Sequence, residues 1–106
     1  MTNEEIYDTE IAPQLLNISV RCRELKMPFV ANVEYERGET GRTEFCPDLK
    51  GDERPSTKQL LVHYAARCNG NVDALIMGII NDAEKYGHGS MYLHMLKVKT
   101  KPDNET

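Results

Sequence analysis

Three cysteines and three histidines are the residues of this chain with the chemistry of a nucleophile or a metal ligand: Cys22, Cys46, Cys68, His63, His88 and His94. A zinc site needs ligand pairs at helical or short-loop spacing. No pair has that spacing, so we expect no metal and no cofactor. Unpaired cysteines commonly serve as small buried hydrophobic residues. Only Cys46, just before Pro47, is a candidate nucleophile. We therefore predict that the protein is not an enzyme. A small hydrolase that uses Cys46 and a histidine stays as a third hypothesis, after the two binding hypotheses given below.

A glycine pair, Gly38-Glu-Thr-Gly41, has the form of the Gly-x-x-Gly loop of KH nucleic-acid domains. The KH loop joins two helices, and a phosphate-binding loop needs Gly-x-x-x-x-Gly-Lys-Ser/Thr between a strand and a helix. This pair lies between two segments with strand-like alternation, so we predict a hairpin turn. The formal net charge of −4 gives no electrostatic reason to expect a nucleic-acid ligand.

Carboxylates are the first candidate binding feature. Alternation over residues 29–36 places Glu34 and Glu36 on the outward face of a strand, and Glu44 on the next strand can lie across from them. Together they predict an acidic ridge bordered by Arg37 and Arg42. The alternative interpretation is a solvated sheet face, which charge protects from edge pairing.

An apolar strip is the second candidate. If residues 90–98 form a strand beside residues 29–36, then Val30, Tyr92, Leu96 and Val98 share one sheet face. Monomers rarely expose such strips in contiguous form. The strip therefore predicts a homodimer contact or a partner surface.

Hydrophobic periodicity predicts the elements that position these residues: helices over 11–26, 56–68 and 72–86, and strands over 29–36, 42–46 and 90–98. The expected fold class is α+β, in the order α-β-β-α-α-β. A small three-stranded, mainly antiparallel sheet carries three helices packed on one face. Strand order two-one-three is one interpretation, and the sequence leaves it open.

The length of 106 residues predicts one domain, over residues 1–98. A polar tail, residues 99–106, is expected to be disordered, and the segment from Asp48 to Pro55 is expected to be a mobile loop. The chain has no long apolar run, and its first five residues are polar and acidic. We therefore expect a soluble, cytoplasmic protein without a membrane segment.

Four segments, Cys22–Ala31, Val33–Gly41, Gly70–Ile76 and Gly87–Leu96, resemble segments of small uncharacterised proteins encoded by tailed bacteriophages and prophages. The resemblance covers most of residues 10–98 and carries no catalytic motif. It implies a phage or prophage accessory protein. Such proteins commonly bind and inhibit a host protein or a component of host defence, or sequester a small signalling molecule.

Two binding hypotheses follow. In the first, the protein binds and inhibits a host protein in the host cytoplasm, with the apolar strip as anchor, the acidic ridge as border and a homodimer as a further expectation. In the second, the chain binds a small ligand or nucleotide in a pocket at a homodimer interface. Its polar contacts would be Arg37, Arg42, His88 and His94.

Overall fold

The computed structural model describes residues 1–48 and 54–98. The chain divides into two compact units, Met1–Ala66 and Arg67–Thr106. The single domain expected over residues 1–98 stays a prediction. The expected disorder of residues 99–106 lies outside the described residues, as does most of the predicted mobile loop.

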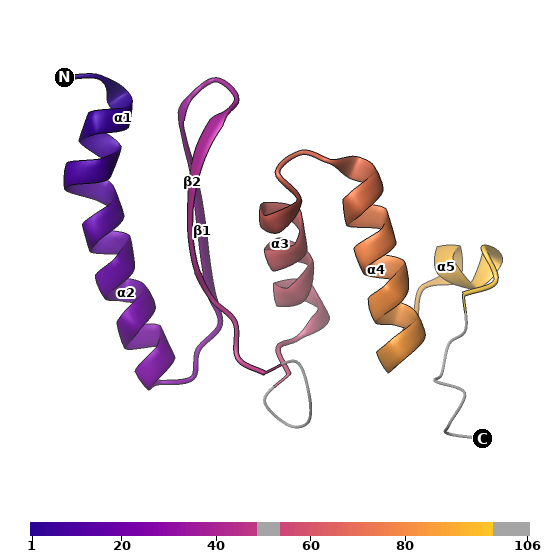
Figure 1. Cartoon of the computed structure of the whole chain (residues 1–106). Coiled ribbons are helices and arrows are strands. Elements are labelled where there is room, and N and C mark those ends of the chain that lie inside the picture. Colours follow the sequence, from indigo (N-terminus) through magenta and orange to yellow (C-terminus); the bar gives the residue numbers. More distant parts are fainter. Residues whose placement is uncertain (49–53, 99–106) are drawn as a thin grey trace. The chain divides into compact units, whose positions relative to one another are not determined.

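The first unit begins with a continuous helix built from α1 (Asn3–Ile6), the π-helical turn η1 (Tyr7–Ile11) and α2 (Ala12–Glu24) (Figure 1). The Thr2 hydroxyl accepts a hydrogen bond from the Glu5 amide at 3.1 Å, which is the first bond of a Thr-x-x-Glu capping box. The π turn accommodates Pro13, which has no amide hydrogen to donate and whose ring would clash with a carbonyl of the preceding turn. The helix therefore starts earlier than the expected residue 11.

The end of α2 is a Schellman motif. The Met27 amide donates to the Cys22 carbonyl at 2.8 Å, and the Lys26 amide donates to the Arg23 carbonyl at 3.2 Å. Lys26 has a φ of 57°, the left-handed conformation that this motif needs. The predicted stop before Pro28 is confirmed.

Strands β1 (Phe29–Glu36) and β2 (Glu39–Phe45) form the predicted antiparallel hairpin. Gly38, in the turn, has a φ of 84°, a conformation that glycine adopts without steric cost. Phe29 pairs with Phe45 at one end of the ladder, and Glu36 pairs with Glu39 beside the turn. β2 begins three residues before the expected start at residue 42.

Two helices contact the two faces of this hairpin. On one face, the Tyr7 ring lies 5.3 Å from the Tyr35 ring, and the Arg23 guanidinium lies 5.1 Å from the Phe45 ring centroid. On the other face, Glu44 reaches α3 (Thr57–Cys68), the part of which up to Ala66 belongs to this unit. Adjacent strand residues point to opposite faces. The expectation that all helices pack on one face is therefore wrong.

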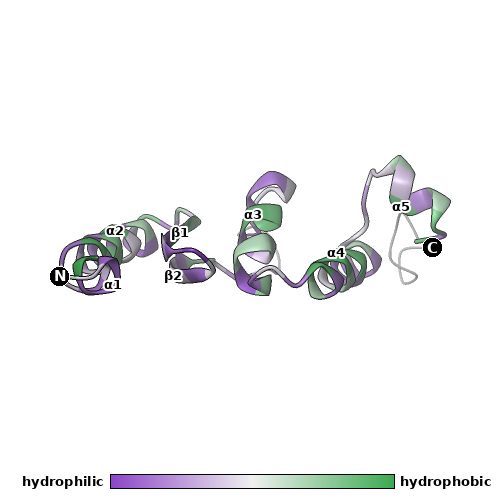
Figure 2. Ribbon diagram, turned by 90° about the horizontal axis from the view of Figure 1, so that it is seen from above, coloured by the Kyte–Doolittle hydropathy of each residue, from purple (hydrophilic) through white to green (hydrophobic). Residues whose placement is uncertain are grey.

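The second unit contains α4 (Val72–Tyr86) and α5 (Met91–Met95). The Asn71 side chain accepts a hydrogen bond from the Ala74 amide at 3.0 Å and so caps the start of α4. The helix ends at Gly87, which has a φ of 87°. Figure 2 shows hydrophobic residues along part of the circumference of α4 and hydrophilic residues along the rest, as expected for an amphipathic helix.

The predicted third strand, residues 90–98, is the main error. The Ser90 hydroxyl accepts from the Leu93 amide at 3.1 Å and caps α5. Lys97, with a φ of 65°, and Val98 close that helix in a second Schellman motif. The segment is apolar on both faces of a would-be strand, and Met and Leu favour helix. Within the described residues the sheet therefore has two strands, and the order two-one-three does not occur.

None of the helices in the described part of the chain is both long enough and apolar enough to cross a lipid bilayer.

Candidate functional site

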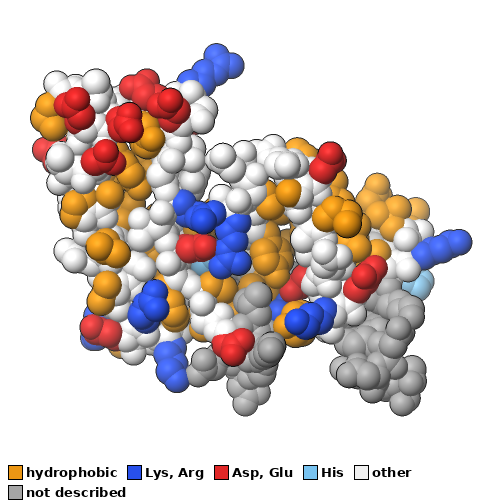
Figure 3. Space-filling model, viewed as in Figure 1, with side chains coloured by type: hydrophobic (Ala, Val, Ile, Leu, Met, Phe, Trp, Pro, Cys, Tyr) orange, Lys and Arg blue, Asp and Glu red, His pale blue; other side chains and the backbone are white. Residues whose placement is uncertain are grey.

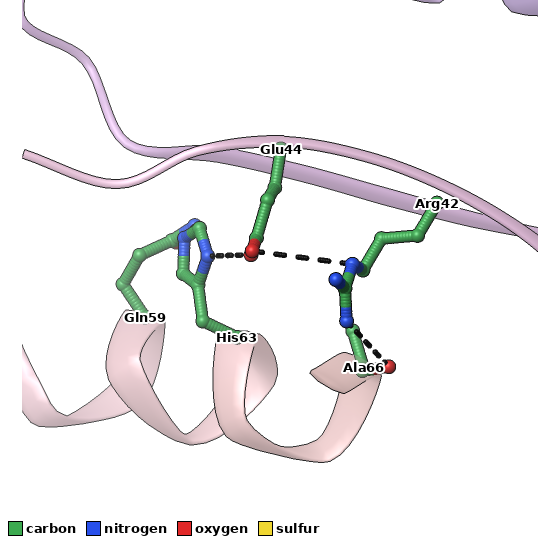
Figure 4. A network of polar contacts seen from close by, with 5 residues as sticks. All are labelled: Arg42, Glu44, Gln59, His63 and Ala66. Carbon is green, nitrogen blue, oxygen red and sulfur yellow. Dashed lines mark hydrogen bonds and ion pairs between the residues drawn. The ribbon is translucent and has the colours of Figure 1, made fainter. Parts of the chain in front are cut away.

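A polar network between β2 and α3 is the main constellation of titratable side chains that the structure assembles (Figure 4). His63 has no exposed surface, and its Nδ1 atom lies 2.8 Å from a carboxylate oxygen of Glu44. Its Nε2 atom lies 3.2 Å from the side-chain nitrogen of Gln59, one turn earlier on α3. Both ring nitrogens of the buried histidine therefore have a hydrogen-bond partner.

The partners of His63 define its tautomer. The Gln59 amide nitrogen is a donor, so Nε2 accepts and Nδ1 carries the hydrogen that it donates to Glu44. In nucleophilic catalysis, a third group such as a carboxylate orients the imidazole base through one ring nitrogen, and the other ring nitrogen faces the nucleophile. Here the second ring nitrogen faces an amide and not a hydroxyl or thiol. The geometry therefore holds α3 on the hairpin and presents no activated nucleophile at His63.

Arg42 extends this network toward the end of α3. Its Nε atom lies 3.9 Å from Glu44, and a terminal guanidinium nitrogen donates to the Ala66 carbonyl at 3.4 Å (Figure 4). A cation at the last carbonyls of a helix is favourable, because those carbonyls lack intrahelical donors. The Arg42 side chain is 40% exposed, so we expect this contact to contribute little on its own.

The face of α3 that meets the hairpin differs from the predicted one. The hydrophobic spacing of residues 56–68 predicts a face made by Leu60, Leu61, Tyr64, Ala65 and Cys68. Leu60 is buried, but Leu61 and Ala65 are exposed, whereas His63 and Gln59 point toward β2 (Figure 4). Hydrophobicity alone missed His63. The signal that could have found it is the four-residue spacing of Gln59 and His63, together with a carboxylate on an adjacent strand.

The members of the predicted acidic ridge have separate roles. Glu44 is only 18% exposed and contacts His63 and Arg42. Glu34 is exposed and accepts a hydrogen bond from the Gly38 amide at 2.8 Å, so its carboxylate supports the turn. Glu36 is exposed opposite Glu39. These three glutamates therefore do not form a continuous acidic ridge along an open sheet face.

The predicted apolar strip is also rearranged. Val30 is half-buried opposite Glu44 in the hairpin, and Val98 is buried in the second unit. Tyr92 lies on α5 and Leu96 caps its carboxyl end, so neither lies on a sheet, and they have 69% and 53% of their surface exposed. Periodicity missed their neighbours Met91 and Met95, which are 83% and 73% exposed on the same short helix. The strip as a shared sheet face is thus wrong, but Tyr92 and Leu96 are at the surface.

The residues proposed for a small ligand are divided between the units. Arg37 and Arg42 belong to the first unit, and His88 and His94 to the second. Arg37 and His94 are exposed. The Arg42 guanidinium contacts Glu44 and Ala66, and the His88 ring bonds the backbone on both of its nitrogens. In the described part of the chain, no contact brings Arg37 together with Arg42, or His88 together with His94, at one site.

The cysteines are half-buried at positions 22, 46 and 68, and none of them forms a disulfide in the part of the chain that the structure describes. In residues 1–48 and 54–98, no three side chains of His, Cys, Asp or Glu lie close enough together to hold a metal ion. The prediction that no metal is bound stays a prediction.

Comparison with known proteins found no similar one: no protein family, no curated protein and no solved structure matches this chain.

Proposed function

We propose that this protein acts by binding another protein and not by catalysis, with the exposed face of α5 as its anchor. The anchor consists of Met91, Tyr92, Met95 and Leu96. In keeping with the resemblance to phage and prophage proteins, the proposed partner is a host protein that binding inhibits by occlusion in the host cytoplasm.

The exposure of these four side chains carries the proposal. Each of them leaves more than half of its surface in water, from 53% for Leu96 to 83% for Met91. Burying such side chains against a partner contributes roughly 1.5–3 kcal/mol each when burial is complete. Tyr is enriched among the residues that dominate binding energies, and flexible Met side chains adapt to a partner's surface.

The helix that carries the anchor is held at both ends. Ser90 caps its start, and the Schellman bonds of Lys97 and Val98 close its end. Defined ends reduce the conformational entropy that binding would otherwise cost. His94 and Lys97 are exposed at or beside the apolar side chains, so a partner groove with an acidic rim would complement this helix.

The test compares three forms of the full chain as baits in a bacterial host extract: wild type, Tyr92→Ser with Leu96→Ser, and a control with Val72→Ser and Met77→Ser. The control residues are exposed apolar side chains of α4 in the same unit. A protein captured by wild type and the control, but not by the α5 variant, is then purified and titrated calorimetrically. We expect the α5 variant to bind at least about tenfold more weakly.

Circular dichroism of all three baits checks that the helices survive the substitutions. Equal binding by the α5 variant and wild type would exclude α5 as the anchor. If the control and the α5 variant lose binding equally, the captured protein binds exposed apolar side chains of the second unit nonspecifically and not the α5 surface.

A further inference from the structure

We propose that Met91 and Met95 form an oxidation-sensitive pair, which hydrogen peroxide converts to methionine sulfoxides and which thereby changes the exposed face of α5 from apolar to polar. The pair belongs to the α5 anchor, so its consequence for partner binding rests on the proposed function. The oxidation itself depends only on the position of the two side chains.

The two thioether groups are open to a dissolved oxidant. Met91 and Met95 are 83% and 73% exposed, whereas Met27 and Met77 are 54% and 56% exposed. Met1, at 80%, is the comparably exposed methionine of the first unit. Figure 3 shows hydrophobic side chains at the surface of the second unit, which contains α5. Peroxide reaches a sulfur atom from the surrounding water, so Met91 and Met95 should be oxidised before Met27 and Met77.

The reaction needs no group of the protein other than the thioether. The sulfur attacks one oxygen of hydrogen peroxide, the O–O bond breaks and an S–O bond forms. The sulfur is oxidised and the peroxide is reduced, and the second peroxide oxygen leaves as water with both protons. The product is a polar, chiral side chain in place of a flexible apolar one, and methionine sulfoxide reductases reverse the change.

Spacing places the two methionines on one side of the helix. Residues four apart are neighbours on a helix surface, so Met91 and Met95 lie one turn apart on α5. Tyr92 and Leu96 are a second pair with the same spacing, and they are 69% and 53% exposed. Oxidation of the methionine pair therefore introduces two sulfoxide groups beside the other apolar side chains of the anchor.

The fold of α5 does not depend on the methionine sulfur atoms. The Ser90 hydroxyl accepts from the Leu93 amide at 3.1 Å, and the His88 ring donates to the Val98 carbonyl at 3.0 Å. These contacts use a hydroxyl, an imidazole ring and backbone groups. A side chain that keeps most of its surface in water also has little packing to lose when it becomes polar. Oxidation should therefore change the surface of α5 and leave its helix in place.

Partner binding should respond to the oxidation. A sulfoxide that is buried at an interface loses its hydrogen bonds to water, and burial of a polar group without a new hydrogen bond is unfavourable. We expect oxidation of the pair to weaken partner binding at least about tenfold, which corresponds to about 1.4 kcal/mol.

Two variants of the full chain isolate the pair. The reference variant, Met27→Leu with Met77→Leu, keeps only Met1, Met91 and Met95. The quadruple variant adds Met91→Leu and Met95→Leu, which replace the pair with apolar side chains of similar volume that favour helix. Peptide mass spectrometry after timed treatment with hydrogen peroxide assigns the added oxygen to each methionine. It also separates these products from oxidation of the half-buried cysteines.

Retention on a phenyl column measures the apolar surface of the free protein. Peroxide should shorten the retention of both variants. The shift of the reference variant should be roughly three times that of the quadruple variant, because three exposed methionines are oxidised in the first and only Met1 in the second. Circular dichroism should stay unchanged, and methionine sulfoxide reductases should restore the retention.

Three results would overturn the proposal: oxidation of Met27 and Met77 before the pair in wild type, equal retention shifts in the two variants, or loss of helix on oxidation. Each would mean that other parts of the protein cover Met91 and Met95. The binding arm uses the protein captured through α5. Its affinity should fall for the oxidised reference variant and not for the oxidised quadruple variant, and an equal affinity for both would refute control of the anchor. Absence of any captured protein would refute the proposed function, whereas the retention result would still decide the oxidation.

Discussion

The Nδ1 atom of His63 lies 2.8 Å from a carboxylate oxygen of Glu44, and this contact joins α3 to the hairpin across 19 residues of sequence. His63 is fully buried, whereas Glu44 keeps 18% of its side-chain surface in water. A buried polar group whose partner is removed costs more than the bond itself contributed, because the group stays desolvated. The pair is therefore a sensitive point for the docking of α3.

Glu44→Ala should lower the free energy of unfolding by about 1–3 kcal/mol, because it leaves the Nδ1–H group of His63 buried without its acceptor. Urea denaturation followed by circular dichroism measures the loss. Glu36→Ala, on the exposed end of β1, is the control and should stay within about 0.5 kcal/mol of wild type. The double variant of Glu44→Ala with His63→Leu should lose less than the sum of the two single losses. Additive losses would mean that the two side chains do not interact.

Gly41 lies against the Tyr7 ring, and a Cβ atom at position 41 would overlap ring atoms of that tyrosine. Gly41→Ala should therefore destabilise the first unit by about 1–3 kcal/mol, as overpacking of a buried contact does. Thermal unfolding measures the change. The sequence pattern placed Gly41 in the turn, whereas the structure places it in β2 opposite Val33.

Gly78→Ala is the contrasting substitution. Gly78 lies inside α4, and a Cβ atom there would have no heavy atom within 4 Å. Alanine is favoured over glycine in a helix interior by up to about 1 kcal/mol, so this variant should be more stable than wild type. The opposite signs of the two Gly→Ala changes are the expected result. Destabilisation by both would mean that Gly78 contacts a part of the molecule that the described contacts omit.

The elements predicted correctly have strong local signals. The hairpin has Gly38 in its turn, α2 ends before Pro28, and Asn71 caps α4. Each signal acts through residues that are neighbours in sequence, so periodicity and turn chemistry suffice to detect it.

The errors arise where the hydrophobic pattern is ambiguous, or where a residue distant in sequence decides. Residues 90–98 are apolar on both sides, and such a short run has no periodicity that separates helix from strand. The Ser90 cap and the hydrogen bonds of His88 stabilise the helical conformation of this segment, α5. The buried side of α3 differs from the predicted one because of a residue distant in sequence. Glu44 on the hairpin contacts the polar His63, which is buried, while the more hydrophobic Leu61 is exposed. The candidate site changed with these elements: Tyr92 and Leu96 are exposed, but on a helix.

Tyr35 gives a pH dependence with a defined sign. Burial raises the pKa of its hydroxyl above the ordinary value of 10.0, and nearby carboxylates raise it further, from Glu4, Glu39 and Asp8. Between the unfolded and folded pKa values the unfolded chain has lost the phenolic proton and the folded chain has kept it. The contribution of Tyr35 to stability is therefore fully present below about pH 10 and is lost as the pH rises through the folded pKa.

Urea denaturation between about pH 8 and about pH 11 measures this effect. Tyr35→Phe should show a shallower loss of stability over the alkaline part of that range, because the group that titrates is absent. Glu4→Gln keeps the tyrosine and removes one of the charges that raise its pKa, so its profile should lie between the two. A Tyr35→Phe profile that is parallel to the wild-type profile would assign the alkaline loss to other groups.

His88 bridges the two ends of α5. Its Nδ1 atom accepts from the Ser90 amide at 3.0 Å, and its Nε2 atom donates to the Val98 carbonyl at 3.0 Å. Both bonds go to backbone groups that lie outside the helix, one before it and one after it. The ring therefore fixes the path of the chain into and out of the proposed anchor.

His88→Ala should release α5 without unfolding the first unit. Two hydrogen bonds hold the segment, and their loss should lower its local stability by about 1–3 kcal/mol. Amide hydrogen exchange from Leu93 to Val98 should then be roughly 5- to 150-fold faster. Hydrogen exchange measured by NMR resolves these amides from those of α2, whose rates should not change. His94→Ala is the matched control, since His94 is exposed on the same helix. If both variants accelerate exchange equally, the effect comes from the helix sequence and not from the His88 contacts. If neither does, α5 is held by its caps alone.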